Sequence, residues 1–171
     1  MRRILVDRAR AWQPVGGQLG IYTGDGRVHL WQPGQPHLTI SFIVDPTNQY
    51  PEYAGSRHFA FSPDGTKLIA GTSQPFARVF DVSTGEPTGI ALEHHEAVYD
   101  ADFSPDGRLL LAADSGLEAI LWEVGTSRMI GAPIWTGGRT TLAAFSPDGR
   151  LLLTNPAGSI QINRIGMDST G

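Results

Sequence analysis

The chain has 171 residues, of which 40% are hydrophobic and 18% are charged, and its net charge at pH 7 is −4. This composition predicts one folded domain; it offers no basic surface for nucleic acid and no apolar run of about 18 residues to span a membrane. The absence of cysteine excludes disulfides and cysteine-ligated metals, and we expect a cytoplasmic protein.

The N-terminal part of the chain predicts short strands joined by tight turns. Residues 22–31, YTGDGRVHLW, read as two strands around a glycine-rich hairpin turn, and residues 37–43 read as a further strand. The following stretch, DPTNQYPEYAG at 45–55, is proline-containing and reads as a loop.

The sequence FSPDG begins at Phe61, Phe103 and Phe145, at two equal intervals of 42 residues. A fixed period of about 40–45 residues predicts an array of identical units. Within each copy, Ser can bond its own backbone, Pro presets φ, Asp tolerates the next position and Gly accepts a positive φ, as in a tight turn between strands. The predicted turn residues are Pro63, Asp64, Gly65, Pro105, Asp106, Gly107, Pro147, Asp148 and Gly149.

Each FSPDG turn is followed by further strand patterns. A short buried strand comes first (TKLIAGT, RLLLAAD, RLLLTN), a second lies at 76–82, 118–124 and 159–165, and an outer one at 87–92 and 129–134. No segment has a sustained helical period, so we predict an all-β protein whose units hold four short strands.

A weaker copy, Trp12-Gln13-Pro14-Val15-Gly16, precedes the other three. Trp12 and Trp31 are 19 residues apart, the same interval as from Phe61 to Phe80. We therefore predict one domain, 1–171, with repeats at approximately 3–45, 52–92, 94–134 and 136–165. The recurring aromatic residues are expected to be core wedges: Trp12, Trp31, Phe80 and Trp122. Trp135 falls outside this position and should be more exposed.

These residues resemble the WD-repeat (WD40) family of β-propellers over nearly the whole chain. The matches are the FSPDG copies, Phe80-Asp81 followed by Thr84-Gly85, and Trp122-Glu123. The resemblance implies a ring of four-stranded antiparallel blades around a central channel, and the regular units are similar to those of bacterial members. About four blades are predicted, as a small closed ring, a partial ring or a ring completed by a dimer.

The hydrogen-bond network of the family is incomplete in this chain. In the family, a His before the first strand often bonds an Asp in a turn, a Ser or Thr, and the Trp. Only His94 stands at the His position, with Gly116 where the Asp is expected and Ala112 or Asp114 near the hydroxyl position. We therefore expect blades that are held together mainly by apolar packing.

No constellation of residues predicts an enzyme, and we predict no catalytic residue, metal or cofactor. Turn formation explains the recurring Asp residues of FSPDG. His94, His95 and Glu96 are adjacent, and adjacent strand residues face opposite sides, so a turn or inter-strand bond is favoured over a metal site. The glycine-rich turns lack the Gly-Lys-Ser/Thr ending of a phosphate loop.

What remains is a binding surface. The resemblance implies that partners bind at the channel mouth, where Arg8, Arg57, Tyr99 and Arg139 are expected, although ordinary rim residues are the alternative reading. We predict Arg57 and Tyr99 on one face, each more than a third exposed. The predicted function is a non-catalytic scaffold for an unknown protein partner. The alternatives are a propeller that binds a small ligand or acts as an enzyme in its channel, and a fragment or assembly unit of a larger propeller.

The last repeat lacks an outer strand, because residues 166–171 are too polar to form one. The apolar segment 3–7 is not used by the first repeat, and rings of this family commonly close by lending such a terminal strand. We predict that residues 3–7 pair with 159–165, within the chain or from a second chain as a homodimer.

Overall fold

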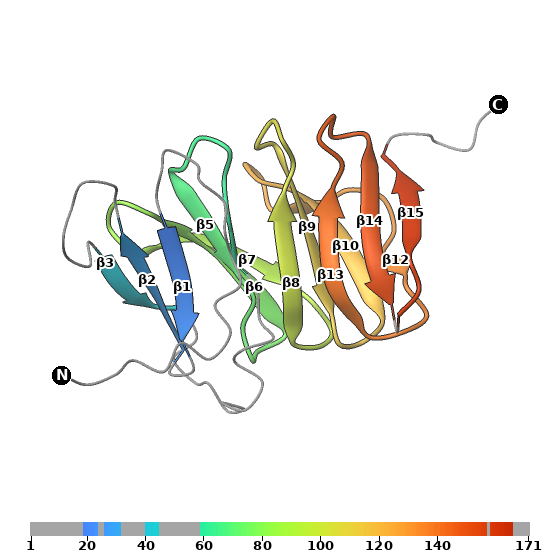
Figure 1. The fold of residues 1–171 in the computed structure, drawn as a ribbon, viewed down its shortest axis with the longest axis horizontal. Helices are drawn as coiled ribbons and strands as arrows, with labels where there is room; N and C mark the ends of the chain where they lie inside the picture. Colours follow the sequence, from blue (N-terminus) through green and yellow to red (C-terminus); the bar gives the residue numbers. More distant parts are fainter. Residues whose placement is uncertain (1–18, 24–25, 32–39, 45–58, 157, 166–171) are drawn as a thin grey trace.

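The structure, a computed structural model, describes residues 19–23, 26–31, 40–44, 59–156 and 158–165. Within these ranges it contains four antiparallel sheets and no helix, which confirms the all-β prediction. The sheets follow one another in chain order along an arc (Figure 1). Accordingly, the described residues include no helix long and apolar enough to cross a membrane.

The first and second sheets are built from strands that neighbour one another in sequence. The first has the order β1-β2-β3, and the second has the order β4-β5-β6-β7. Their bounds are β1 Leu19–Thr23, β2 Arg27–Trp31, β3 Ile40–Ile43, β4 Phe59–Phe61, β5 Lys67–Ala70, β6 Phe76–Asp81 and β7 Pro87–Glu93. The strands predicted at 22–31 and 37–43 are thus present, whereas the copy containing Trp12 lies outside the described residues.

The third and fourth sheets repeat the same order. Their bounds are β8 Val98–Phe103, β9 Leu109–Asp114, β10 Glu118–Glu123, β11 Arg128–Met129, β12 Ile134–Trp135, β13 Thr140–Phe145, β14 Leu151–Pro156 and β15 Gln161–Arg164. The single outer strand predicted at 129–134 is wrong, because β11 and β12 are two short strands that both pair with β10. Gly131 has a φ of 72° and Pro133 lacks a backbone donor, so the intervening residues cannot extend the ladder.

The FSPDG turns have the predicted backbone geometry. Gly65, Gly107 and Gly149 have φ values of 71°, 72° and 69°. The Ser104 hydroxyl was predicted to form a hydrogen bond with the backbone of its own turn, but it instead bonds a side chain of the turn and the backbone of the following strand. It donates to Asp106 Oδ1 and accepts from the backbone N–H of Leu109, at 2.7 and 2.8 Å. The serine thereby ties the turn to the strand that follows it.

The turns of successive sheets stack on one another. A Cβ placed on Gly107 would lie 3.5 Å from Cδ of Pro63, and one placed on Gly149 would lie 3.5 Å from Cδ of Pro105. The two junctions therefore share the same geometry at this edge. The 42-residue period of the sequence corresponds to a constant step from one sheet to the next.

The core is divided into one apolar cluster per junction between sheets. The first joins Val28 and Leu30 to Phe59 and neighbouring residues of the second sheet, and similar clusters join the second sheet to the third and the third to the fourth. Each fully buried Leu, Ile or Phe contributes about 1.5–3 kcal/mol of burial free energy. Stability therefore resides between the sheets, as expected of stacked repeats.

The ring is not closed within the described residues. None of their apolar clusters joins the first sheet to the fourth, and these two sheets lie at opposite ends of the arc (Figure 1). The strand predicted to close the ring, residues 3–7, lies outside the described residues, so its pairing with 159–165 stays a prediction.

Candidate functional site

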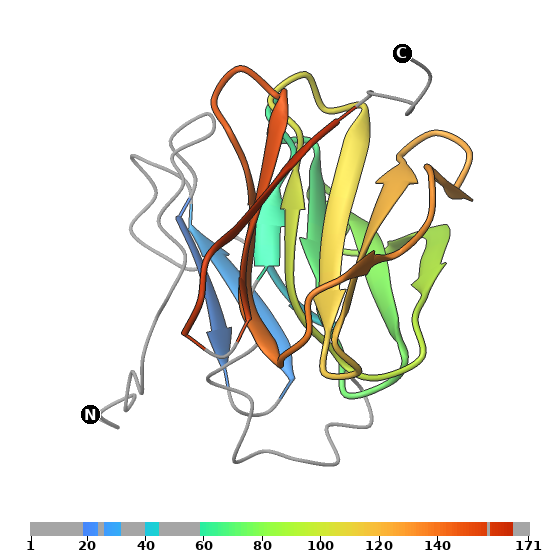
Figure 2. The same cartoon turned by 90° about the vertical axis from the view of Figure 1, so that its right-hand side faces the viewer.

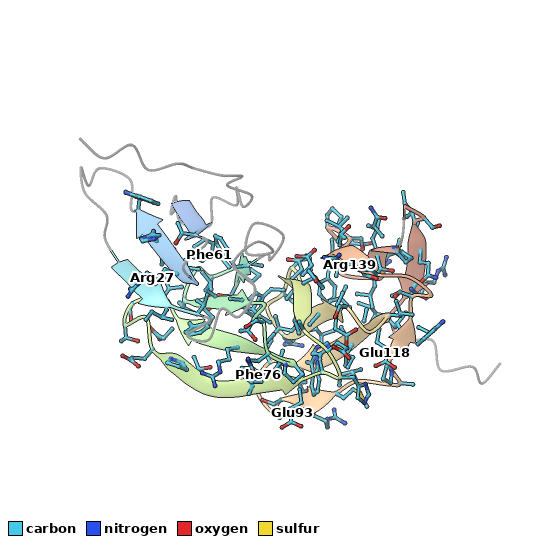
Figure 3. The ribbon with its side chains drawn as sticks, turned by 90° about the horizontal axis from the view of Figure 1, so that it is seen from below. Arg27, Phe61, Phe76, Glu93, Glu118 and Arg139 are labelled. Atoms are coloured by element: carbon cyan, nitrogen blue, oxygen red, sulfur yellow. The ribbon has the colours of Figure 1, made fainter. Side chains whose placement is uncertain are left out.

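Two of the four predicted contact residues, Tyr99 and Arg139, touch each other. The guanidinium carbon of Arg139 lies 4.2 Å from the centre of the Tyr99 ring, which is a cation–π geometry. Tyr99 is the second residue of β8 and Arg139 immediately precedes β13, the neighbouring strand of the next sheet. Figure 3 views the end where β8 and β13 begin and shows Arg139 on the inner side of the arc, with Glu93 on the outer side.

A β-bulge sets the position of the tyrosine. Val98 pairs with Asp114 and Asp100 pairs with Ala113, so Tyr99 is an extra residue on β8. Such bulges re-aim side chains at the ends of strands. Tyr99 is half-buried because the Arg139 guanidinium covers its ring, and Arg139 itself is exposed. The other two predicted contact residues, Arg8 and Arg57, lie outside the described residues, so the prediction that Arg57 and Tyr99 share a face stays untested.

Two aspartates on β8, not predicted as functional residues, link the third sheet to the fourth. Asp100 Oδ2 accepts from the backbone N–H of Ala143 at 2.7 Å, and Asp102 Oδ2 accepts from that of Phe145 at 3.1 Å. These bonds join the inner strands of two successive sheets across 43 residues of sequence. The sequence feature that could have identified these aspartates is the presence of two acidic residues in the strand YDADF. The equivalent positions one repeat later are Leu and Ala.

Burial raises the pKa of the Asp102 carboxyl to about 6. The hydrogen bond from Phe145 opposes this effect, and the neighbouring charge of Asp100 adds to it. The carboxylate is thus costly to ionise where it stands. Because each aspartate already accepts a backbone hydrogen bond from the next sheet, both are explained by a structural role.

His94 and Asp114 form a buried pair, with His94 in the connection between β7 and β8 and Asp114 at the end of β9. His94 Nδ1 is 3.3 Å from Asp114 Oδ2, and both side chains are fully buried. A carboxylate oxygen only accepts, so Nδ1 carries the hydrogen. Asp114 Oδ1 also accepts from the backbone N–H groups of Gly116 and Glu118, at 2.9 and 3.2 Å. The expected position of the acid was therefore wrong by two residues, because Asp114 rather than residue 116 faces the histidine.

The network does not continue to the tryptophan. The rings of His94 and Trp122 are 6.1 Å apart, and His94 Nε2 and Trp122 Nε1 have no hydrogen-bond partner among the described residues. Ala112, one of the two residues expected near the hydroxyl position, has no polar side chain that could bridge them. Burial acts to raise the pKa of Asp114, but the bonds from His94, Glu118 and Gly116 outweigh it and hold the pKa below its usual value.

This segment is where a comparison with known families gives a match. Residues 85–123 match the family described as WD domain, G-beta repeat. They form a WD40 repeat. The matched range contains the outer strand β7 of the second sheet and the strands β8, β9 and β10 of the third. No curated protein matches the chain.

The WD40 repeat thus straddles a junction and contains the polar groups that organise it. His94 lies in the connection between the two sheets, and Tyr99 and Asp100 lie at the start of the inner strand that follows. One repeat unit therefore supplies the last strand of one sheet and the first three strands of the next. This arrangement ties neighbouring sheets covalently.

The second histidine of the WD40 repeat faces outward. His95 is 81% exposed and its Nδ1 lies 3.0 Å from Glu118 Oε2, whereas His94 is buried. The hydrogen bond to Glu118 raises the pKa of His95. The prediction that the two histidines face opposite sides is confirmed. No group of three or more His, Cys, Asp or Glu able to hold a metal occurs in the part of the chain that the structure describes.

The remaining residues singled out from the sequence lie in the core, at the surface or in turns, and their contacts are explained by packing and turn formation. Phe80 is 1% exposed, Trp122 packs against the cluster between the second and third sheets, and Trp31 is half-buried beside His29. Trp135 is 63% exposed, as expected for its position outside the repeat pattern. Hydrogen bonds from Ser62 and Thr66 lower the pKa of Asp64 to about 2, and the equivalent bonds lower the pKa of Asp106 and Asp148. These carboxylates are turn formers.

Proposed function

We propose that this protein is a non-catalytic scaffold that binds a protein partner at the inner rim of its arc of sheets, through Tyr99 and Arg139. The observation that carries the proposal is the cation–π pair between these residues within and beside a WD40 repeat. WD40 repeats generally serve protein–protein interaction. Tyr and Arg are also the side chains most often found to dominate binding energy at protein interfaces.

The geometry of the pair favours a partner with an acidic group. The contact with the Tyr99 ring restrains the guanidinium, so part of the side-chain entropy is lost before binding. No carboxylate within the described residues forms an ion pair with Arg139. A guanidinium held in this way can receive a carboxylate through two parallel hydrogen bonds.

The surrounding polar groups support a scaffold rather than an enzyme. Asp100 and Asp102 accept backbone hydrogen bonds from the fourth sheet, and Asp114 accepts them within its own turn. A general base needs an oxygen free to reach a substrate proton. These carboxylates instead fix the strands that present Tyr99 and Arg139.

The proposal can be tested by comparing partner capture by the parent and by the double variant Tyr99→Ala/Arg139→Ala. The bait is incubated with an extract of its source cells, and the retained proteins are identified by mass spectrometry. The matched control is Arg150→Ala, which removes one exposed charge from a turn after β13. We expect a partner that the parent and the control retain equally and that the double variant retains at least about tenfold less.

The follow-up measurement is the affinity of the purified partner for each variant and for Arg139→Lys. Lysine keeps the charge but loses the planar two-bond geometry, so it should not restore binding. Equal retention of every partner by the double variant and the parent, with unchanged melting temperatures, would place the binding surface elsewhere.

A further inference from the structure

The fourth sheet exposes two large apolar side chains where the other sheets bury theirs. Ile160 is 69% exposed and Ile162 is 62% exposed. Ile162 pairs with Leu153 on the neighbouring strand, as Leu121 pairs with Leu111 one repeat earlier. The register therefore identifies equivalent positions in each sheet.

At these positions every earlier sheet is covered by the next one. The residues equivalent to Ile162 are Leu30, Val79 and Leu121, with exposures of 2%, 0% and 7%. The residues equivalent to Ile160 are Val28, Ala77 and Ala119, each 0% exposed. All six belong to the apolar clusters between successive sheets. The free face of the fourth sheet is therefore equivalent to the face that packs against the following sheet at each junction of the structure.

The rest of this face is also apolar. Leu153 lies opposite Ile162, Ala144 lies opposite Leu153, and Leu142, two residues before Ala144, is 40% exposed. Figure 2 looks onto the fourth sheet, with β15 in front of β14, and no other described element lies in front of it. Large apolar side chains that are exposed together on one face mark a contact site.

The three internal junctions show which residue of the following sheet packs near the residue equivalent to Ile162, which we call the inserted residue. In each, the inserted side chain shares an apolar cluster with a leucine on the second strand of the following sheet. The three pairs are Leu30 with Leu68, Val79 with Leu110, and Leu121 with Leu152. These leucines pair in register with Phe80, Trp122 and Asn163.

The first sheet carries the same receiving position. Leu19 pairs with Trp31 just as Leu68 pairs with Phe80 and Leu110 pairs with Trp122. In the described residues no sheet precedes the first one to fill this position. The described part of the chain thus has one inserting face, on the fourth sheet, and one receiving face, on the first, at opposite ends of the arc (Figure 1).

We propose that the fourth sheet docks against the first sheet of a second copy of this chain, with Ile162 packed against β1 at the register position of Leu19. The interface is head-to-tail, so a second, identical contact can form between the remaining free faces. Two copies of four sheets give eight, which is within the range of four to eight blades seen in propellers. The dimer completes the ring that is open within the described residues.

The mass in solution is the first test, measured by light scattering over a range of concentrations. We expect the parent to have twice the chain mass of 18.4 kDa. Ile162→Asp should be monomeric, because it introduces a charge at the contact. Met129→Asp, at a residue 42% exposed on β11, should remain dimeric. A monomeric parent at every soluble concentration, or a dimeric Ile162→Asp, would overturn the proposal.

Cross-linking tests which faces meet, because the chain has no cysteine. Ile162→Cys and Leu19→Cys chains are mixed with a bismaleimide whose span is about 10 Å, the spacing of packed sheets. We expect cross-linked dimers that contain one chain of each kind, and few from either variant alone. Dimers from Ile162→Cys alone would show a face-to-face contact and overturn the head-to-tail arrangement. A cross-link inside a monomeric double variant would show closure within one chain and overturn the dimer.

Discussion

Removal of the Asp114 carboxylate tests whether the His94–Asp114 pair stabilises the WD40 repeat. The carboxylate receives hydrogen bonds from His94 Nδ1 and from the backbone N–H groups of Gly116 and Glu118. In Asp114→Ala the histidine keeps its buried position but loses its only hydrogen-bond partner among the described residues. Because both ring nitrogens of His94 would then be unpartnered, the folded state should be strongly destabilised.

The magnitude follows from the burial of each partner. A hydrogen bond to a charged, fully buried group contributes about 1.5–3 kcal/mol, and the His94 bond is of this kind. Gly116 and Glu118 are partly exposed, so water can replace their bonds and each contributes about 0.5 kcal/mol. We therefore expect Asp114→Ala to lower the free energy of unfolding by about 3 kcal/mol. Asp114→Asn, which retains one acceptor oxygen, should lose less.

The assay is urea unfolding followed by tryptophan fluorescence and circular dichroism. The control is Asp106→Ala, which removes an exposed carboxylate that also accepts a side-chain and a backbone hydrogen bond. We expect this control to lose about 1 kcal/mol or less, because its partners become hydrated. If both variants lose the same free energy of unfolding, the buried pair does not have the stabilising role derived from its geometry.

Three further substitutions test the backbone and the junctions. Gly71→Ala should lower the free energy of unfolding by about 2–3 kcal/mol, because the new Cβ would lie 2.5 Å from the Val98 carbonyl oxygen; an unchanged urea midpoint would refute this. Gly107→Val should cost about 1–3 kcal/mol through its φ of 72°, whereas Gly125→Ala, with open space around it, should be neutral in the same thermal melts. Asp102→Asn should stabilise the fold by about 1–3 kcal/mol at pH 7, where the parent carboxyl is ionised at a cost. Because the folded pKa of about 6 is above the ordinary carboxyl value of 3.8, the parent loses stability as pH rises between these values, and the two proteins should converge below that window.

The repeat pattern allowed most of the fold to be predicted. A turn with Pro, Asp and Gly at fixed offsets depends on local φ preferences, so three identical copies fixed three equivalent turns. The strands around them followed from short apolar runs. The exposure of Trp135 followed from its position outside the period. These features are local, and a single sequence contains the information for them.

The candidate site could be predicted only in part. Tyr99 and Arg139 were both expected at the channel mouth from the resemblance, but their direct contact involves a bulge at Tyr99 that was not predicted. The bonds from Asp100 to Ala143 and from Asp102 to Phe145 join residues 43 apart. Counting along the repeat placed the acid partner of His94 at residue 116, because counting cannot show which turn residue points inward.

Closure of the ring depends on a property that no single repeat contains. Each sheet carries the same inserting and receiving positions, so the sequence shows which side chains meet at a junction. The number of sheets in the ring depends instead on the small rotation from each sheet to the next, summed over the array. The contacts of Gly20 with the Phe59 ring and of Gly71 with the Val98 carbonyl oxygen leave no room for a side chain, so neighbouring sheets approach closely at these glycines. The four described sheets do not meet and leave two complementary faces, and in the dimer proposed above a second chain presents both.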